Sequence, residues 1–335
     1  MDYKAMGTNA AKSDSTSRAI VPGRILQDDT DFICYQCANL DQTVEYAFKR
    51  VLENLDYARR VSGAESVNMH LTMGMKGGRF EMATVQPYQD KRNAKKNPEL
   101  AYRVTELRNM LANHKSSKFV PIVNIIQEAD DSLRQMQYAR IQTHGVESSV
   151  IRSGDKDLWF SEGLHVDNQG RFYTVDGYGW TEYREVGNVK PKLIGQGTSW
   201  FWHQLIMGDG ADNIPGLPKL SGRLLNRYVP TKTYNAKRKA GACGEAKAVA
   251  MLDGVTTDAE AATRIMEAYQ DTYGLIEGAV MLVEQAFLLW IRRTSKLCEV
   301  ITFLRECGLN VSFTTSQALR LQDFGNKVKE QRGMS

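Results

Sequence analysis

The sequence predicts an α/β fold, with a central and mostly parallel sheet flanked by helices. The first observation is that short apolar segments alternate with longer amphipathic segments up to about residue 200. The second is that acidic residues follow three of the predicted strands, where ligand sites of open α/β sheets lie. Because the chain has 335 residues, of which 42% are hydrophobic, it can bury one large core or two smaller ones.

The elements can be placed in order along the chain. A strand is predicted before Asp29 and an amphipathic helix over 40–61, where apolar residues recur three and four apart. Further strands are predicted within 66–74, 117–126 and 148–154, with a hairpin over 164–177 that turns at 168–170. Beyond Trp200 the pattern is helical, over 199–207, 220–229, 257–273 and 278–307.

These elements divide into three regions: a disordered tail at 1–17, an α/β domain at 18–200 and a helical domain at 201–335. No apolar run approaches the roughly 18 residues of a membrane span, and the polar start lacks a secretory signal. Five cysteines, an odd number, indicate reduced thiols in a cytoplasmic compartment.

Carboxylates gather at the predicted strand ends. They comprise Asp29 with Asp31, then Glu128 with Asp130 and Asp131, and then Asp155 with Asp157. Because the carboxyl ends of parallel strands meet at one edge of a sheet, these acids are expected to converge. A fourth pair, Asp209 and Asp212, starts a predicted helical region and would share one helix face.

A cluster of carboxylates without histidine or cysteine favours Mg²⁺ or Mn²⁺. Two such ions about 4 Å apart can activate water and stabilise the leaving oxygen of a phosphodiester. Taken singly, a pair such as Asp209 and Asp212 is more often a helix cap or a solvated surface pair. An EF-hand is excluded, because Leu158, Trp159 and Phe160 follow Asp157 where further oxygen ligands and a glycine are required.

The motifs QEADD, SGDKDLWF and MGDGADNIPGLP, in this order, resemble those of the 5′-nucleases: flap endonucleases, polymerase 5′ to 3′ exonuclease domains and phage 5′-exonucleases. The resemblance covers about residues 24–225 and implies a PIN-like fold with a helix-three-turn-helix region that binds DNA. It implies one metal ion held by Asp29, Glu128, Asp130 and Asp131, and a second held by Asp155, Asp157, Asp209 and Asp212.

The resemblance also implies a helical arch near 88–115, through which a single strand passes. At its base, Lys91 and Arg92 would contact the scissile phosphate, and Tyr88 could stack on an unpaired base. Residues 216–247 hold eight basic side chains against one acidic side chain, which favours contact with duplex phosphates. The expected DNA-binding residues are Arg79, Tyr88, Lys95, Lys96, Gly216, Lys219, Arg223, Arg227, Lys237, Arg238 and Lys239.

The sequence departs from the family pattern at three places. Gln89 stands where the family has an arch lysine, which Lys91 would replace, and Met75 lies near the position of an absent acid. Lys219 and Ser221 interrupt a glycine-rich hairpin that binds K⁺ in the family, so a K⁺ site is in doubt.

The function that these features favour is two-metal hydrolysis of DNA at 5′ ends or 5′ flaps, in replication or recombination. A ribonuclease acting on RNA or an RNA–DNA hybrid would use the same acids. A DNA-binding protein with a decayed site would have lost some of them. The sequence gives no protein partner.

Overall fold

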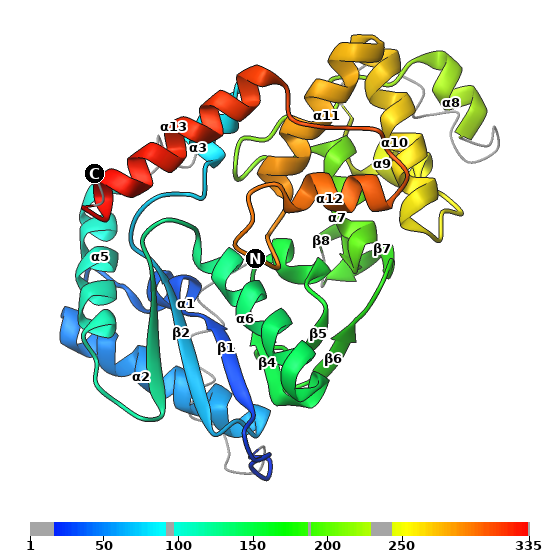
Figure 1. The fold of residues 1–335 in the computed structure, drawn as a ribbon. Helices are drawn as coiled ribbons and strands as arrows, with labels where there is room; N and C mark the ends of the chain where they lie inside the picture. Colours follow the sequence, from blue (N-terminus) through cyan, green and yellow to red (C-terminus); the bar gives the residue numbers. More distant parts are fainter. Residues whose placement is uncertain (1–16, 92–96, 187–188, 229–242, 334–335) are drawn as a thin grey trace. The chain divides into compact units, whose positions relative to one another are not determined.

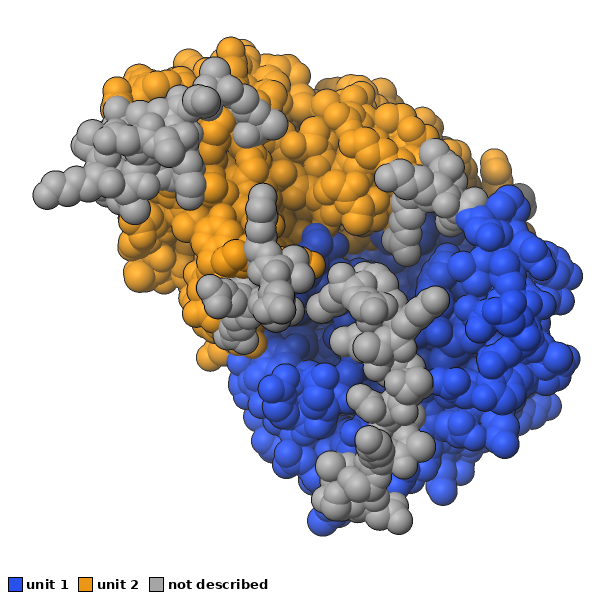
Figure 2. All heavy atoms as spheres, turned by 180° about the vertical axis from the view of Figure 1, so that it is seen from behind, with its two compact units in different colours: residues 1–77, 95–175, 293–295 blue, residues 78–94, 176–292, 296–335 orange. Residues whose placement is uncertain are grey.

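The computed structural model describes residues 17–91, 97–186, 189–228 and 243–333 (Figure 1). The chain forms two compact units. Unit 1 comprises 1–77, 95–175 and 293–295, and unit 2 comprises 78–94, 176–292 and 296–335 (Figure 2). This division differs from the boundary predicted near residue 200. Residues 1–16 of the predicted tail lie outside the described residues. Among the residues that the structure describes, no helix is long and apolar enough to cross a bilayer.

Unit 1 contains a six-stranded sheet of order β3-β2-β1-β4-β5-β6. Its strands are β1 (Ile25–Asp29), β2 (Ser66–Thr72), β3 (Phe119–Asn124), β4 (Ser149–Arg152), β5 (Gly163–Val166) and β6 (Phe172–Val175). The first five strands run parallel, and β6 pairs antiparallel with β5 through the predicted hairpin. The expected mostly parallel sheet is therefore confirmed.

The helices of unit 1 begin at capping residues that are visible in the sequence. They are α1 (Thr30–Cys37), α2 (Val44–Ser62), α5 (Pro98–Ala112) and α6 (Ala129–His144), with short 3₁₀ turns η2 (Val146–Ser148) and η3 (Lys156–Phe160). The Thr43 hydroxyl accepts a hydrogen bond from the first turn of α2, and left-handed Gly63 ends that helix. Asn97 and Pro98 start α5 in the same way.

The two faces of this sheet differ in chemistry. Leu26, Val67, Met69 and Leu71 belong to an apolar core that also takes in buried residues of α2 and α5. Deleting one such side chain to alanine costs about 2–5 kcal/mol. The alternate strand residues point to the other face, which α6 covers and which carries buried polar side chains.

Unit 2 is mainly helical but includes an antiparallel hairpin of β7 (Trp180–Val186) and β8 (Val189–Gln196), which the sequence analysis missed. Its helices are α3 (Arg79–Met82), α7 (Thr198–Met207), α8 (Gly222–Tyr228), α9 (Glu245–Met251), α10 (Asp258–Tyr273), α11 (Leu275–Leu289), α12 (Glu299–Glu306) and α13 (Thr315–Gln331). The single helix predicted over 278–307 was wrong, because α11 ends at Leu289 and α12 begins at Glu299.

Aromatic residues of unit 2 contribute to its core. Trp290 stacks on Phe303 at 4.5 Å between ring centroids, and Phe201 meets Trp290 edge to face at 5.0 Å. Both tryptophans of this cluster, Trp202 and Trp290, are almost completely buried. These rings are therefore unavailable to stack on bases.

Candidate metal centre

Asp29 is the last residue of β1 and also the N-cap of α1. Its Oδ1 accepts a hydrogen bond from the Phe32 backbone N–H at 3.2 Å, and its Oδ2 accepts one from the Ser153 hydroxyl at 2.7 Å. Ser153 directly follows β4, the neighbouring strand of the sheet. The carboxylate is thus fixed at the carboxyl edge of the sheet and is 5% exposed.

The amino end of α6 supplies three further acids. Glu128 is the N-cap residue, and Asp130 and Asp131 lie in the first turn, where the helix dipole favours negative charge. The Ala129 backbone N–H donates to the Thr72 hydroxyl at the end of β2, with 2.8 Å between N and Oγ1. This bond attaches the acidic turn to the sheet.

Asp155 comes from the loop after β4 and caps η3. Its backbone N–H donates to the Ser153 hydroxyl at 2.9 Å, and its Oδ1 accepts from the Asp157 N–H at 3.0 Å. Ser153 therefore orients both Asp29 and Asp155. A single hydroxyl links two of the predicted ligands.

The electrostatics show that these carboxylates lie close together. Burial raises the pKa of Asp130 well above its ordinary value, and the negative charges of Asp29, Asp155, Glu128 and Asp131 raise it further. Burial, opposed by the Ser153 hydrogen bond, raises the pKa of Asp29 to about 6. Five of the predicted ligands are thus brought together in unit 1, in an arrangement that a cation would relieve.

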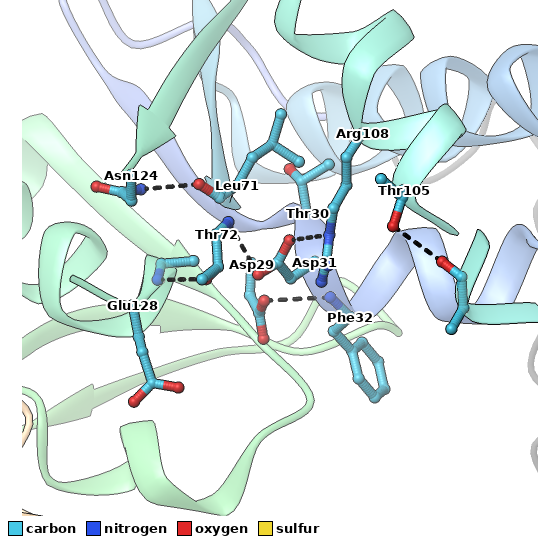
Figure 3. Close-up of polar contacts among 12 residues, drawn as sticks. Asp29, Thr30, Asp31, Phe32, Leu71, Thr72, Thr105, Arg108, Asn124 and Glu128 are labelled. Carbon is cyan, nitrogen blue, oxygen red and sulfur yellow. Dashed lines mark hydrogen bonds and ion pairs between the residues drawn. The ribbon is translucent and has the colours of Figure 1, made fainter. Parts of the chain in front are cut away.

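Neighbouring acids pair with arginines, although their charges still contribute to the raised pKa of Asp29. Asp28, one residue before Asp29, is completely buried in an ion pair with Arg152 at 2.5 Å. Asp31, which the sequence suggested as a second acid of the site, pairs with Arg108 of α5 at 2.8 Å and accepts from the Thr72 N–H at 3.0 Å (Figure 3). Asp31 therefore stabilises the junction of α5 with the sheet.

Lys76 was missed by the sequence analysis. Its ammonium group lies 3.0 Å from Glu128 Oε1, beside the place where the family pattern led us to seek an acid at Met75. Lys76 follows β2 closely in the sequence, and acidic residues follow the neighbouring strands. A basic residue at such a position is the signal that could have identified Lys76. Lys76 supplies a positive charge at the edge of the carboxylate cluster.

The donor set fits a hard divalent cation, because it offers carboxylate oxygens from the ends of β1 and β4 and from the amino end of α6. Within the described ranges, no three His, Cys, Asp or Glu side chains are placed so that they could together hold a metal ion. Carboxylates repel one another, which favours longer distances between their oxygen atoms. The raised pKa values of Asp29 and Asp130 are the observation that supports a cation at this place.

The remaining predicted metal ligands make contacts of their own. Asp157 pairs with the adjacent Lys156 at 3.1 Å. Asp209 and Asp212 belong to unit 2. They lie in a turn closed by paired backbone hydrogen bonds between Asp209 and Ile214, so the expectation that they share a helix face was wrong.

Asp212 already accepts hydrogen bonds on both carboxylate oxygens. Tyr88 donates to Oδ2 and Gln89 donates to Oδ1, each at 3.0 Å, and the Gln89 backbone N–H donates to the Asp212 carbonyl. Gln89 has φ 58°, a conformation that costs a non-glycine residue about 1–3 kcal/mol and that these bonds maintain. Gln89, where a lysine was expected, thus fixes residues 87–90 to the turn.

Two predicted DNA contacts have structural roles instead. Tyr88 is 3% exposed and packs edge to face on Phe80, so its ring face cannot receive a base in this structure. Arg79 is 4% exposed and donates to the carbonyls of Leu288 and Trp290, which caps the end of α11. Both predictions rested on residue type, and a basic or aromatic residue type does not reveal whether the side chain is buried.

The remaining predicted contacts differ in their exposure. Gly216 is buried, and a Cβ there would lie 2.3 Å from the Gly208 nitrogen, so only glycine fits. Lys91 and Lys219 are exposed. Arg223 and Arg227 are also exposed, but they pair with Asp271 and Glu267 of α10, acids outside the basic segment. The predicted residues that lie outside the described ranges are Arg92, Lys95, Lys96, Lys237, Arg238 and Lys239.

The predicted arch is described only in part. Residues 98–112 form α5, whose Val104, Leu107 and Leu111 pack into the core of unit 1. Residues 92–96, which precede it, lie outside the described ranges. Most of α5 is therefore a packed helix of the α/β unit.

Comparison with solved structures finds similar proteins. A structure of the T5 5′-exonuclease with bound zinc ions aligns with a TM-score of 0.53 and 14% identity, covering 90% of this chain and 98% of that one. A second T5 protein structure, co-crystallised with metal ions, aligns with a TM-score of 0.49, 13% identity and the same coverage. No family model and no curated protein sequence matches the chain. The first likeness confirms the 5′-nuclease fold that the motifs implied.

Proposed function

We propose that this protein is a divalent-metal-dependent 5′-nuclease that hydrolyses DNA phosphodiester bonds. The observation that carries the proposal is the electrostatic coupling of Asp130 with Asp29, Glu128, Asp131 and Asp155 at the carboxyl edge of the sheet. The fold shared with a phage 5′-exonuclease supports this class of reaction. In the sequence, acidic residues follow predicted strands, and this pattern is consistent with both the parallel sheet and a carboxylate cluster at its edge.

The residues of unit 1 would hold and orient Mg²⁺, with Mn²⁺ as a substitute. Asp29, Asp130 and Asp155 would provide oxygen ligands, with Glu128 and Asp131 completing the negative field. A bound divalent cation lowers the pKa of water and stabilises the leaving oxygen of a phosphodiester. The Ser153 hydroxyl would keep Asp29 and Asp155 in fixed orientations, because it bonds to both residues.

The basic residues of unit 2 would bind the phosphates of the substrate without reading its sequence. Lys219 and Lys91 are exposed and available for such contacts. Arg223 and Arg227 would first have to leave their carboxylate partners on α10. We infer a preference for 5′ ends and 5′ flaps, with a role in replication or recombination, from the motif resemblance, and retain Asp209 and Asp212 as predicted ligands.

The test is cleavage of 5′-labelled flap, nicked duplex, RNA–DNA hybrid and single-stranded substrates by the full chain. The proposal predicts release of short 5′ products from the flap in Mg²⁺ and none with a chelator. Preferential cleavage of the hybrid would instead assign a ribonuclease. Duplex binding with no cleavage in Mg²⁺ or Mn²⁺ would contradict the proposal and indicate a decayed site.

A further inference from the structure

The sheet of unit 1 presents an unusual surface to α6. Helix–sheet contacts in α/β folds are normally apolar, as on the opposite face of this sheet. Beneath α6, however, the central strands present buried polar side chains. The residues concerned are Gln27 of β1, Asn68, His70 and Thr72 of β2, and Ser149 of β4.

These side chains contact α6 in a regular sequence along β2. The Thr72 hydroxyl accepts from the Ala129 N–H at 2.8 Å, and His70 Nδ1 lies 2.5 Å from the Ser132 hydroxyl oxygen. Farther along, Asn68 Nδ2 lies 3.9 Å from the sulfur of Met136. Steps of two residues down the strand are matched by steps of three or four residues along the helix. The contacts therefore specify one axial position of α6.

His70 is the centre of this row. Its Nε2 lies 2.9 Å from Gln27 Oε1, which also accepts from Asn68 Nδ2 at 3.0 Å, while Gln27 Nε2 donates to the Ser149 hydroxyl. Because Gln27 Oε1 can only accept, the imidazole carries its proton on Nε2 and Nδ1 accepts from Ser132. Burial lowers the pKa of His70 to about 3, which keeps this neutral form at ordinary pH.

An apolar interface would let a helix slide by a fraction of a turn with little change in energy, since dispersion contacts are not directional. A buried hydrogen-bonded row has directional bonds, and sliding would leave buried polar groups unpaired. The same end of α6 carries Glu128, Asp130 and Asp131. Their distance from Asp29 depends on where α6 lies along the sheet.

We propose that the row from Thr72 through His70 to Asn68 sets the axial position of α6, and that His70 is a positioning residue for the carboxylates of the metal centre. This inference rests on the proposed function, because it assigns His70 a role in metal binding rather than in stability alone. Gln27 fixes the orientation of the imidazole, and Thr72 fixes the first turn of the helix. Asp31 supports Thr72 by accepting its backbone N–H.

The test is the affinity of the full chain for Mn²⁺, measured by titration calorimetry, in three variants of β2. His70→Leu removes both imidazole hydrogen bonds and should weaken Mn²⁺ binding about tenfold or more, as expected when the partners that orient metal ligands are lost. His70→Gln keeps an amide that can donate and accept, and should stay within about threefold of the parent.

Met69→Ala is the matched control. Met69 lies on the same strand but belongs to the apolar core on the other face. The Met69→Ala substitution should lower the melting temperature while leaving Mn²⁺ affinity within about threefold of the parent. If Met69→Ala weakened Mn²⁺ binding as much as His70→Leu at equal loss of stability, or if His70→Leu bound Mn²⁺ like the parent, the positioning role would be refuted.

Hydrogen exchange of the α6 amides provides a readout that needs no metal. His70→Leu, and Thr72→Val if the first variant fails to fold, should speed exchange at 129–133 specifically, whereas Met69→Ala should not. Failure of the parent to bind Mn²⁺ would overturn the proposed metal centre, while the exchange result would still decide whether the row positions α6. Unchanged exchange at 129–133 in both variants would overturn the inference itself.

Discussion

The carboxylates around Asp130 in unit 1 and those in the turn after α7 in unit 2 are held in different ways. In unit 1, Asp130 faces four other carboxylates, and burial and repulsion raise its pKa. In unit 2, both oxygens of Asp212 accept hydrogen bonds from side chains, and Asp209 Oδ1 accepts from the Ala211 N–H at 2.7 Å. Acids that look alike in the sequence therefore differ in environment: burial and neighbouring carboxylates raise the pKa of Asp130, whereas side-chain hydrogen bonds hold Asp212 in its turn.

This difference separates carboxylates that repel one another, which we propose to hold a cation, from carboxylates that accept hydrogen bonds within a turn. In unit 1, arginines pair with Asp28 and Asp31 next to the cluster and Lys76 pairs with Glu128 at its edge, whereas the pKa values of Asp29 and Asp130 are raised. This contrast can be tested by removing a carboxylate, a proton, a metal ion or a phosphate contact from one region at a time.

The largest effect is expected for Asp130→Asn. Removing the central carboxylate should reduce single-turnover cleavage of a 5′ flap in Mg²⁺ by about 10² to 10³ or more, because the metal loses a charged ligand. Duplex affinity, measured by fluorescence anisotropy in chelator, should change little. Cleavage by Asp130→Asn at the parent rate would place the reaction elsewhere.

The second prediction concerns pH in the absence of metal. The pKa of Asp29 rises from 3.8 in the unfolded chain to about 6 in the fold, so between these values the folded protein binds more protons. Its stability should therefore fall as pH rises from about 4 to 6, by roughly 3 kcal/mol from Asp29 if nothing compensates. Chemical denaturation in chelator at these pH values measures this loss, and Mg²⁺ should restore stability more at pH 8 than at pH 5. Equal Mg²⁺ effects at both pH values would argue against a buried carboxylate site.

A pair of substitutions compares the two regions directly by stability in chelator. At alkaline pH, where Asp130 is ionised, Asp130→Asn should raise the melting temperature because it relieves repulsion among carboxylates. Asp212→Asn should lower unfolding free energy by about 1–3 kcal/mol, because Tyr88 and Gln89 lose a charged acceptor. Shifts of the same sign in the two variants would remove the distinction between the regions.

The smallest effect is expected in the basic part of unit 2. Lys219→Ala should weaken duplex binding and reduce the slope of log affinity against log salt by about one, as for one lost phosphate contact. Arg223→Ala should change the slope less, since Asp271 already neutralises its guanidinium group at 2.8 Å. Exchanging K⁺ for a larger inert cation should alter neither result, and a marked K⁺ requirement would contradict a direct role for Lys219.

Sequence reasoning predicted the parallel sheet and the cluster because both depend on local patterns. Apolar runs define the strands, and the acids of Asp29, Asp130 and Asp155 directly follow or flank the strand ends. The β7–β8 hairpin was missed because its polar strands lack a clear apolar alternation. The burial of Arg79 and Tyr88 depends on partners more than a hundred residues away, which no local pattern reveals.

The most direct test of the metal centre is titration calorimetry of Mn²⁺ into the full chain near pH 6, in two buffers of different ionisation enthalpy. The account predicts binding with release of protons, because Asp29, whose pKa is about 6, is partly protonated at this pH and a cation displaces its proton. Asp130→Asn should lose most of this affinity and release fewer protons. Binding without proton release, or binding unchanged by Asp130→Asn, would contradict the assignment of the unit 1 carboxylates as the metal centre.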